Sequence, residues 1–515
     1  MFGRHLGTRT AVACLQVALV LFFGSASLVH ANPAGEEVAA GSASFDRNGT
    51  TLTINTSDRV IINWQDFSIA SGELTKFIQP SATSAALNRV VSGNPSAIFG
   101  TLQANGQIFL INPNGILVGN GAVIDTGGFI ASTFDVSNSE FLSGGNLHFT
   151  GDSAAKVENQ GRINAIGGDI ILIARHVENK GELNAPDGTV GLAAGTEVLL
   201  AQAGEERVFV KPALSDEPAS GTGILNSGTI QAARAELKAT GNLYALAINN
   251  TGIIRANGAV TRNGRVYLTA NGGAITSSGT ISAKNQDGTG GKIVVDGGHS
   301  DQQPSTVLVS GVLDVSGTKG GEIQVLGDQV GLIDQATVDA SGDFGGGTLL
   351  IGGDYQGGGS IANAAKTFIG SDAVITADAL TSGDGGKVIV WADDWTRYYG
   401  SISARGGALG GGGGFVEVSG KQNLDFYGTA NVGASAGNAG TILLDPRDGT
   451  IQSGASGTGN GFLPEVTFAE GGSGTDYTFG ETALEGLTGN IVIQVSRNLS
   501  MNNGVVLNLN NQTSG

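Results

Sequence analysis

The stretch VENQGRINA, residues 157–165, recurs as VENKGELNA at residues 177–185. Looser copies of its second half follow along the chain: GTIQA from residue 228, GIIRA from 252, GTISA from 279, GVLDV from 311, ATVDA from 336, AVITA from 373 and GSISA from 400. The starts of these copies lie 24 to 37 residues apart. A repeat in this range is typical of a solenoid, in which each unit packs against its neighbours.

A second repeated element is a glycine pair followed by a short segment of alternating apolar residues. Four copies are clear: GGKIVV at 290–295, GGEIQV at 320–325, GGKVIV at 385–390 and GGFVEV at 413–418. Alternate residues of a strand point to opposite faces, so four aliphatic pairs are predicted to point inward. These pairs are Ile293/Val295, Ile323/Val325, Val388/Val390 and Val416/Val418. The residues predicted to point outward are Lys292, Glu322, Gln324 and Glu417.

The apolar runs are too short and too often interrupted by Gly, Asn and Asp to form helices. We therefore predict an all-β fold, a right-handed parallel β-helix with stacked Ile, Val and Leu inside. Glycines and asparagines are expected to supply positive φ angles at its corners. Ala232–Ala239 is the best helical candidate, but we predict a strand because it lies within the repeat.

Two local features depart from the plain repeat. Asn159, Asn179 and Asn226 could form a stacked column at one corner or make ordinary turns, and the sequence leaves both open. The segment 203–221 breaks the pattern with two prolines and a group of charged residues. It is predicted to be a hairpin or loop that projects from the β-helix.

The N-terminus has the pattern of a signal peptide. Arg4, His5 and Arg9 precede a nearly unbroken apolar run, Ala11 to Phe23, that is short for a membrane span. Residues 1–31 are therefore predicted to be removed by cleavage between Ala31 and Asn32. No later stretch is apolar enough to cross a membrane.

Composition limits the partners of the mature chain. The formal net charge of the full sequence is −18, and it becomes −20 without Arg4 and Arg9 of the signal peptide. Such a surface repels nucleic acid and anionic lipid. The single cysteine, Cys14, lies within the signal peptide, so the mature chain would have none.

The stretch from residue 60 to 135 carries the most specific pattern in the chain. It contains Ile62-Asn63-Trp64-x-x-Phe67-x-Ile69, Leu87-Asn88-Arg89-Val90, the run GQIFLINPNGI at 106–116 and GFIAST at 128–133. These motifs, in this order, resemble those of the haemagglutination-activity domain, the secretion domain of two-partner secretion exoproteins. The resemblance implies a β-helix with an N-terminal cap and hairpins outside the helix.

The resemblance also implies a route and a partner. The chain would reach the periplasm unfolded, be bound there by the periplasmic domains of a dedicated outer-membrane transporter barrel, and fold outside the cell. The protein would then be secreted or held at the cell surface of a Gram-negative bacterium. The secretion motif would be Asn112, Pro113, Asn114, Gly115 and Ile116, and transporter recognition would involve Asn63, Trp64, Phe67, Asn88 and Arg89.

Taken alone, Asn112-Pro113-Asn114-Gly115 is a turn between apolar strands, because Pro113 fixes φ and Asn114-Gly115 accepts left-handed angles. The motif could therefore act by setting the register of the first coils or by contacting the transporter. The sequence leaves these two roles open.

Further motifs look like the corresponding segments of high-molecular-weight adhesins and haem–haemopexin utilisation exoproteins. These motifs are GKVIVW at 386–391, GFVEVSG at 414–420 and LLDP at 443–446. An upstream Asn-Pro-Asn-Leu motif of some relatives is missing, which favours this branch. The expected domains are the secretion domain at 32–290, a β-helix extension at 291–445 and a β-rich region at 446–515. We expect the chain to be a fragment of a longer protein.

Catalysis is not expected. The nearest approach to a catalytic group is Asp393-Asp394-Trp395 with Arg397, and its predicted role is a corner loop. The three histidines after the signal peptide, His148, His176 and His299, have no metal-ligand spacing, so we expect neither a metal nor a cofactor.

The favoured function is an adhesin that binds a host cell or surface receptor. One alternative is an exoprotein that captures a haem carrier, and another is a β-helical polysaccharide-degrading enzyme. Trp391, Trp395, Tyr398 and Tyr399 could form an exposed aromatic patch for such contacts, although packing is the expected role of Trp391.

Overall fold

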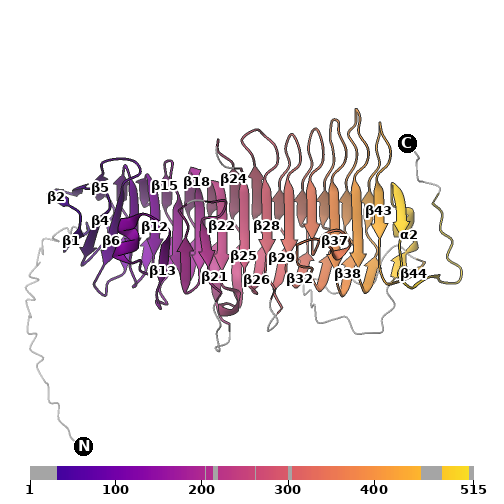
Figure 1. Cartoon of the computed structure of the whole chain (residues 1–515), viewed down its shortest axis with the longest axis horizontal. Coiled ribbons are helices and arrows are strands. Elements are labelled where there is room, and N and C mark those ends of the chain that lie inside the picture. Colours follow the sequence, from indigo (N-terminus) through magenta and orange to yellow (C-terminus); the bar gives the residue numbers. More distant parts are fainter. Residues whose placement is uncertain are drawn as a thin grey trace, which may run out of the picture. The chain divides into compact units, whose positions relative to one another are not determined.

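The computed structural model describes residues 32–202, 204–212, 219–260, 263–299, 304–453 and 478–509. The predicted signal peptide, including Ala31, lies outside these residues. The described chain folds into a right-handed parallel β-helix, as the repeat predicts (Figure 1). Each complete coil contributes one strand to each of three parallel sheets, called sheets 1, 2 and 3 below.

Sheet 1 contains β3 (Thr51–Thr56), β5 (Leu74–Ile78), β8 (Thr101–Ala104), β11 (Val123–Thr126), β15 (Arg162–Ala165), β18 (Glu182–Ala194), β22 (Thr229–Ala239), β24 (Ile253–Asn257), β27 (Thr280–Lys284), β30 (Val312–Asp314), β33 (Thr337–Asp339), β36 (Val374–Thr376), β39 (Ser401–Ser403) and β42 (Thr429–Asn431). Strands β18 and β22 turn the corner and also pair in sheet 2. Ala232–Ala239 lies in β22, so its assignment as a strand is confirmed.

Sheet 2 contains β4 (Val60–Trp64), β6 (Ala85–Val90), β9 (Gln107–Ile111), β12 (Gly128–Ser132), β16 (Ile170–Ala174), β25 (Arg265–Ala270), β28 (Lys292–Asp296), β31 (Glu322–Leu326), β34 (Thr348–Ile351), β37 (Lys387–Ala392), β40 (Phe415–Gly420), β43 (Thr441–Leu444) and β46 (Asn490–Ile493). Sheet 3 contains β7 (Ser96–Ile98), β10 (Ile116–Val118), β14 (Lys156–Asn159), β17 (His176–Asn179), β21 (Thr222–Asn226), β23 (Leu246–Asn250), β26 (Ala274–Ser277), β29 (Thr306–Val309), β32 (Gln329–Leu332), β35 (Lys366–Ile369), β38 (Trp395–Tyr398), β41 (Asn423–Phe426), β44 (Asp448–Gln452), β45 (Thr478–Gly480) and β47 (Asn498–Met501).

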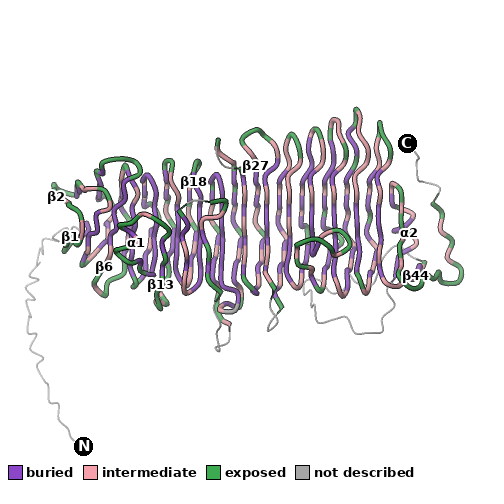
Figure 2. The backbone as a smooth tube through the Cα atoms, in the orientation of Figure 1, coloured by how far each residue is buried: buried purple, intermediate pink, exposed green. Residues whose placement is uncertain are grey.

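The interior is a continuous column of aliphatic side chains. All eight residues predicted to point inward from the glycine-pair strands are 0% exposed. They stack in register, so that Ile293 lies opposite Ile323 and Val388 opposite Val416 in the next coil. Figure 2 shows the buried residues running along the strands and the exposed ones gathering at turns and loops. Burial of this column is the main favourable contribution to folding.

Of the four residues predicted to point outward from the glycine-pair strands, three lie at the surface and one is fully buried. Lys292, Glu322 and Gln324 are half-buried on the outer face of sheet 2, and Lys292 Nζ lies 3.0 Å from Glu322 Oε1. Glu417 alternates with inward valines as predicted but is 0% exposed. A loop covers it from outside, which no local pattern around residue 417 indicates.

The paired glycines have a different role from the one predicted. A Cβ on Gly321, Gly347 or Gly386 would lie 2.1 to 2.2 Å from the carbonyl oxygen of the glycine in the preceding coil. These positions are glycine because the backbones of successive coils approach closely, not because φ is positive. Among the described non-glycine residues, positive φ occurs only at Arg59, Asp334 and Gln356, so the prediction for asparagine is wrong.

The stacked column of asparagines is confirmed. Asn159 Nδ2 donates to Asn179 Oδ1 at 2.9 Å, and Asn179 Nδ2 donates to Asn226 Oδ1 at 2.8 Å. Asn250 and Ser277 extend the column by two further coils. The side chains satisfy one another inside the helix, where an unpaired amide would be destabilising.

We expect Asn179→Ala to lower the free energy of unfolding by about 2–4 kcal/mol, since it leaves one donor and one acceptor of its neighbours unpaired. Asn184→Ala is the control, because Asn184 is half-buried and, among the described residues, its side chain makes a single hydrogen bond, 3.4 Å long, to Asn164. It should change the stability by less than about 1 kcal/mol. Urea unfolding followed by circular dichroism measures both, and equal losses would contradict the structural role of the column.

The first coils are closed by antiparallel strands that act as an N-terminal cap. Strand β1 (Glu37–Ala40) pairs with β4, and β2 (Ala43–Asn48) pairs with β3. Asn32, the first described residue, is 9% exposed. Its side chain donates to Thr50 O at 3.0 Å and accepts from Thr75 Oγ1 at 2.8 Å. The residue predicted to begin the mature chain is therefore part of the folded cap.

Further elements lie outside the β-helix. They are α1 (Asn138–Ser143) and an antiparallel sheet of β13 (Leu147–Thr150), β19 (Glu197–Leu200) and β20 (Val208–Val210). Short helical turns lie at η1 (Gly241–Leu243), η2 (Tyr355–Gly357) and α2 (Glu481–Glu485). The described part of segment 203–221 leaves the β-helix as predicted. Its strand β20 packs back on the outer face of sheet 2, where Val208 and Val210 join an apolar cluster outside the main core. Residues 203 and 213–218 of that segment are outside the described residues.

Candidate secretion site

The Asn112-Pro113-Asn114-Gly115 turn connects β9 of sheet 2 to β10 of sheet 3. Asn112 is 0% exposed, and its side chain holds the turn from within. Its Nδ2 donates to Asn94 O at 3.0 Å and to Ser96 Oγ at 2.9 Å, and its Oδ1 accepts from Asn114 N at 2.9 Å. Asn112 thus fixes the loop of the preceding coil and the turn itself.

The other residues of the turn divide between surface and interior. Pro113 and Asn114 are exposed, and Asn114 Nδ2 donates to Ser92 O at 2.8 Å. Gly115 is buried with a φ of 109°, a conformation that side chains rarely adopt. Ile116 begins β10 and points into the interior. The predicted left-handed geometry is found at Gly115 and not at Asn114.

Three of the five predicted recognition residues lie inside the first coils. Trp64, Phe67 and Asn88 are all 0% exposed. Trp64 Nε1 donates to Asn88 Oδ1 at 3.0 Å, and the Trp64 and Phe67 rings meet edge to face at 5.6 Å. These three side chains can contact a transporter only while the chain is unfolded, so in the folded protein they build the core.

Arg89 and Asn63 are the outward members of the predicted set. The Arg89 guanidinium binds the loop before α1 and the first residue of α1. It donates to Asp135 Oδ1 at 3.0 Å, to Val136 O at 3.0 Å and to Asn138 Oδ1 at 3.1 Å. Asn63 is half-buried, and its Oδ1 is buried without a hydrogen-bond partner among the described residues. The recognition role of all five residues stays a prediction.

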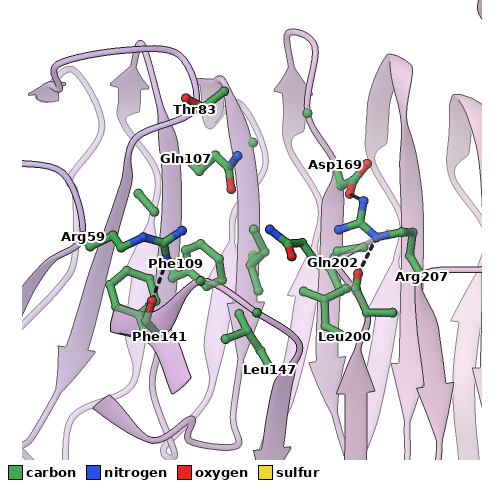
Figure 3. Close-up of a pocket in the computed structure, with 18 of the residues that line it drawn as sticks. Arg59, Thr83, Gln107, Phe109, Phe141, Leu147, Asp169, Leu200, Gln202 and Arg207 are labelled. Atoms are coloured by element: carbon green, nitrogen blue, oxygen red, sulfur yellow. Dashed lines mark hydrogen bonds and ion pairs between the residues drawn. The ribbon is translucent and has the colours of Figure 1, made fainter. Parts of the chain in front are cut away.

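A pocket of about 460 Å³ lies on the outer face of sheet 2 (Figure 3), and none of the five predicted recognition residues lines it. Phe109 and Phe141 line it at one end, where Arg59 donates to Phe141 O at 2.6 Å. Arg207, which pairs with Asp169 and donates to Ala201 O at 2.6 Å, lines the other end. Arg59 and this pocket were not predicted from the sequence, because the walls of the pocket come from segments far apart in the chain.

The exposed aromatic patch that the sequence left open is not formed. Trp391, Trp395 and Tyr398 are 4%, 2% and 0% exposed, and Tyr399 is half-buried. Tyr398 stacks on Phe426 at 5.1 Å inside the helix, and packing is confirmed for Trp391, which belongs to a small apolar cluster. No surface for glycan contact is formed by these residues.

The described residues show no group of histidine, cysteine and carboxylate side chains that could hold a metal. Asp393 and Asp394 lie half-buried at the corner between β37 and β38, as expected for a corner loop. Within the described part of the chain, none of the helices has the length and apolar character needed to cross a membrane.

Comparison with known proteins decides the family. A model of the TPS secretion domain matches residues 29–283. Residues 29–283 belong to the TPS secretion domain family. The chain is similar to the crystal structure of the HMW1 secretion domain from Haemophilus influenzae, with 29% identity and a TM-score of 0.52 over 80% of this chain and all of that one. The β-helix and its secretion-domain assignment are therefore both confirmed.

Two curated relatives, both from Haemophilus influenzae, are named heme/hemopexin-binding protein. One is 29% identical over 265 residues, which cover 49% of this chain and 29% of that protein. The other is 44% identical over 80 residues, which cover 16% of this chain and 9% of that protein. The matches to this chain thus span less than a third of either relative. The TPS secretion domain itself ends near residue 283, yet the β-helix continues without interruption through β27 and β28.

Proposed function

We propose that residues 32–290 direct this chain through a cognate outer-membrane transporter and that the coils beyond them present an adhesive surface outside the cell. The match of residues 29–283 to the TPS secretion domain carries the proposal. The secreted protein would pass through the periplasm before reaching the transporter. The predicted extension at 291–445 would be the cargo nearest to the secretion domain.

The fold supplies a physical reason for directed export. Each coil buries its aliphatic residues only against the coil before it, so a chain emerging from its N-terminal end can fold one coil at a time. Every added coil removes apolar surface from water and opposes the return of the chain through the pore. The cap formed by β1 to β4 offers the first template for this stacking.

Deleting residues 32–283 should abolish release into the medium when the chain is coexpressed with its transporter barrel. The signal peptide is kept, so the deleted protein should accumulate in the periplasm instead. The control is a deletion of one later coil, residues 366–394, which removes β35, β36 and β37 and so one strand of each sheet. Immunoblots of medium and periplasm measure both, and normal release of the first deletion would overturn the proposal.

Capture of a haem carrier is the second candidate, because both curated relatives are named heme/hemopexin-binding protein. The purified chain would be tested for binding to haem-loaded hemopexin and, separately, to host epithelial cells. Adhesion predicts binding to cells without hemopexin. Binding to hemopexin alone would favour the second candidate and reject the first.

A further inference from the structure

A loop between β34 and β35 lies across the outer face of sheet 2. This loop, residues 352–365, is called the strap here. It contacts three successive coils: Lys387 Nζ lies 2.7 Å from Asp354 Oδ1, the Tyr355 and Phe415 rings meet at 5.6 Å, and Gln356 Nε2 donates to Asp445 Oδ2 at 3.2 Å. The strap therefore ties coils together along the helix axis, at right angles to the strands.

The strap covers an apolar patch that would otherwise face solvent. Leu350, Ile389 and Trp391 form this patch on the outer face, and Ile361 of the strap packs against it. The contact is close, because a Cβ on Gly357 would lie 2.6 Å from the Trp391 ring. Opening of the strap would expose these side chains to water.

The centre of the strap rests on a buried carboxylate. The Oε1 and Oε2 atoms of Glu417 accept hydrogen bonds from Gln356 N at 3.3 and 3.1 Å. Gln356 has a φ of 52°, an uncommon conformation for a residue with a side chain, so the strap bends sharply at the point where it contacts Glu417. No salt bridge to Glu417 is formed among the described residues.

The groups that face Glu417 compensate its charge only in part, and burial outweighs them. Asp445, directly after β43, raises the pKa of Glu417, whereas Lys387 of β37 and a hydrogen bond from the Ser419 side chain lower it. Lys387 is itself paired with Asp354 of the strap. Burial raises the pKa of Glu417 to about 7, and burial also raises the pKa of Asp445. Burial acts to raise the pKa of Asp354 as well, but the hydrogen bond from Lys387 holds it below its ordinary value.

We propose that the strap is a pH-sensitive cover, closed over the apolar patch when Glu417 carries a proton and released when Glu417 is ionised. Closure removes the carboxyl from water, and a buried charge without a salt-bridge partner is disfavoured. Release returns Glu417 to solvent and exposes Trp391, Ile389 and Leu350 to water.

The direction of the pH effect follows from linkage. The closed strap holds the Glu417 proton more tightly than the open one, so closure is strongest below the ordinary carboxyl pKa of 4.5 and weakens as the pH rises to about 7. The difference between these two values corresponds to a fall of about 300-fold in the closing equilibrium constant. Above about pH 7 no further loss from Glu417 is expected.

Hydrogen exchange with mass spectrometry tests this on the secreted chain. Protection factors of the strap amides, which remove the intrinsic pH dependence of exchange, should fall by about 100-fold between pH 4.5 and pH 7.5, because half of the open-state carboxyl is already ionised at pH 4.5. Glu417→Gln keeps an acceptor but cannot ionise, so its strap should stay protected at both pH values. Glu322→Gln, a carboxyl on the same sheet face that is half-exposed, should behave as the wild type.

Strap protection that does not change with pH in the wild type would overturn the proposal. So would a Glu417→Gln variant with the same pH dependence as the wild type. Peptides from β28 and β31 report whether the helix itself is intact in each sample. If Glu417→Gln loses protection there, Glu417→Leu provides the same test, because it replaces the carboxyl by an apolar side chain of similar size.

Discussion

Ile281→Asp should unfold the coils around β27, whereas Ser282→Asp one residue further along should be tolerated. Ile281 is 0% exposed inside the helix. A carboxylate there has no charged partner and no water, so we expect a loss of about 4–5 kcal/mol or more in the free energy of unfolding. Urea unfolding of the purified chain, followed by circular dichroism, measures the loss.

Ser282→Asp is a demanding control because it introduces the same side chain into the same strand. Ser282 is half-buried on the outer face and lies in register with Arg255 in one coil and Asp314 in the next. The new carboxylate would therefore meet one cation and one anion at the surface, and the expected change is within about 1 kcal/mol. Equal losses in the two variants would show that the strand has no fixed inner face.

The inner column was predictable because it rests on local patterns. Alternation in GGKIVV and its copies assigns Ile293 and Val295 to one face of a strand, whatever the distant parts of the chain do. The repeat then requires each strand to stack on the next. The same reasoning placed Ala232–Ala239 in a strand against its helical composition, and β22 confirms it.

Features made by distant segments were not predictable in this way. Glu417 lies on the outer face as its position requires, but residues 352–365 cover it from about 60 positions away in the chain. Strand β13 pairs with β19 across a similar separation. No periodicity links such segments, since their positions depend on how the completed coils fold back on themselves.

The candidate site was predictable as a turn and not in its detail. Proline followed by Asn-Gly indicates a reversal between strands, and the structure has one at residues 112–115. Which asparagine points inward depends on Ser96 and Asn94 of the preceding loop, which the motif does not contain. Likewise, Trp64 and Asn88 resemble a recognition motif in sequence but hydrogen-bond to each other within the core.

Asn112→Ala should reduce both folding stability and export far more than Asn114→Ala. Asn112 is fully buried, and its loss leaves Ser96, Asn94 and the Asn114 amide without their side-chain partner. We expect a decrease of about 3 kcal/mol in the free energy of unfolding. Asn114 is exposed and its amide donates to Ser92 O at 2.8 Å and to Asn112 Oδ1 at 3.2 Å, so about 0.5–1 kcal/mol is expected from the loss of these surface bonds.

The pair of variants separates the two roles that the sequence left open for the turn. If the turn acts by folding the first coils, the amount of protein released through the coexpressed transporter should follow the stability of each variant, and Asn114→Ala should be released nearly normally. Export lost in Asn114→Ala while its unfolding curve stays close to that of the wild type would instead indicate direct contact between the exposed half of the turn and the transporter. We expect the first result, because the buried half of the turn makes its contacts with neighbouring coils and the exposed half makes few.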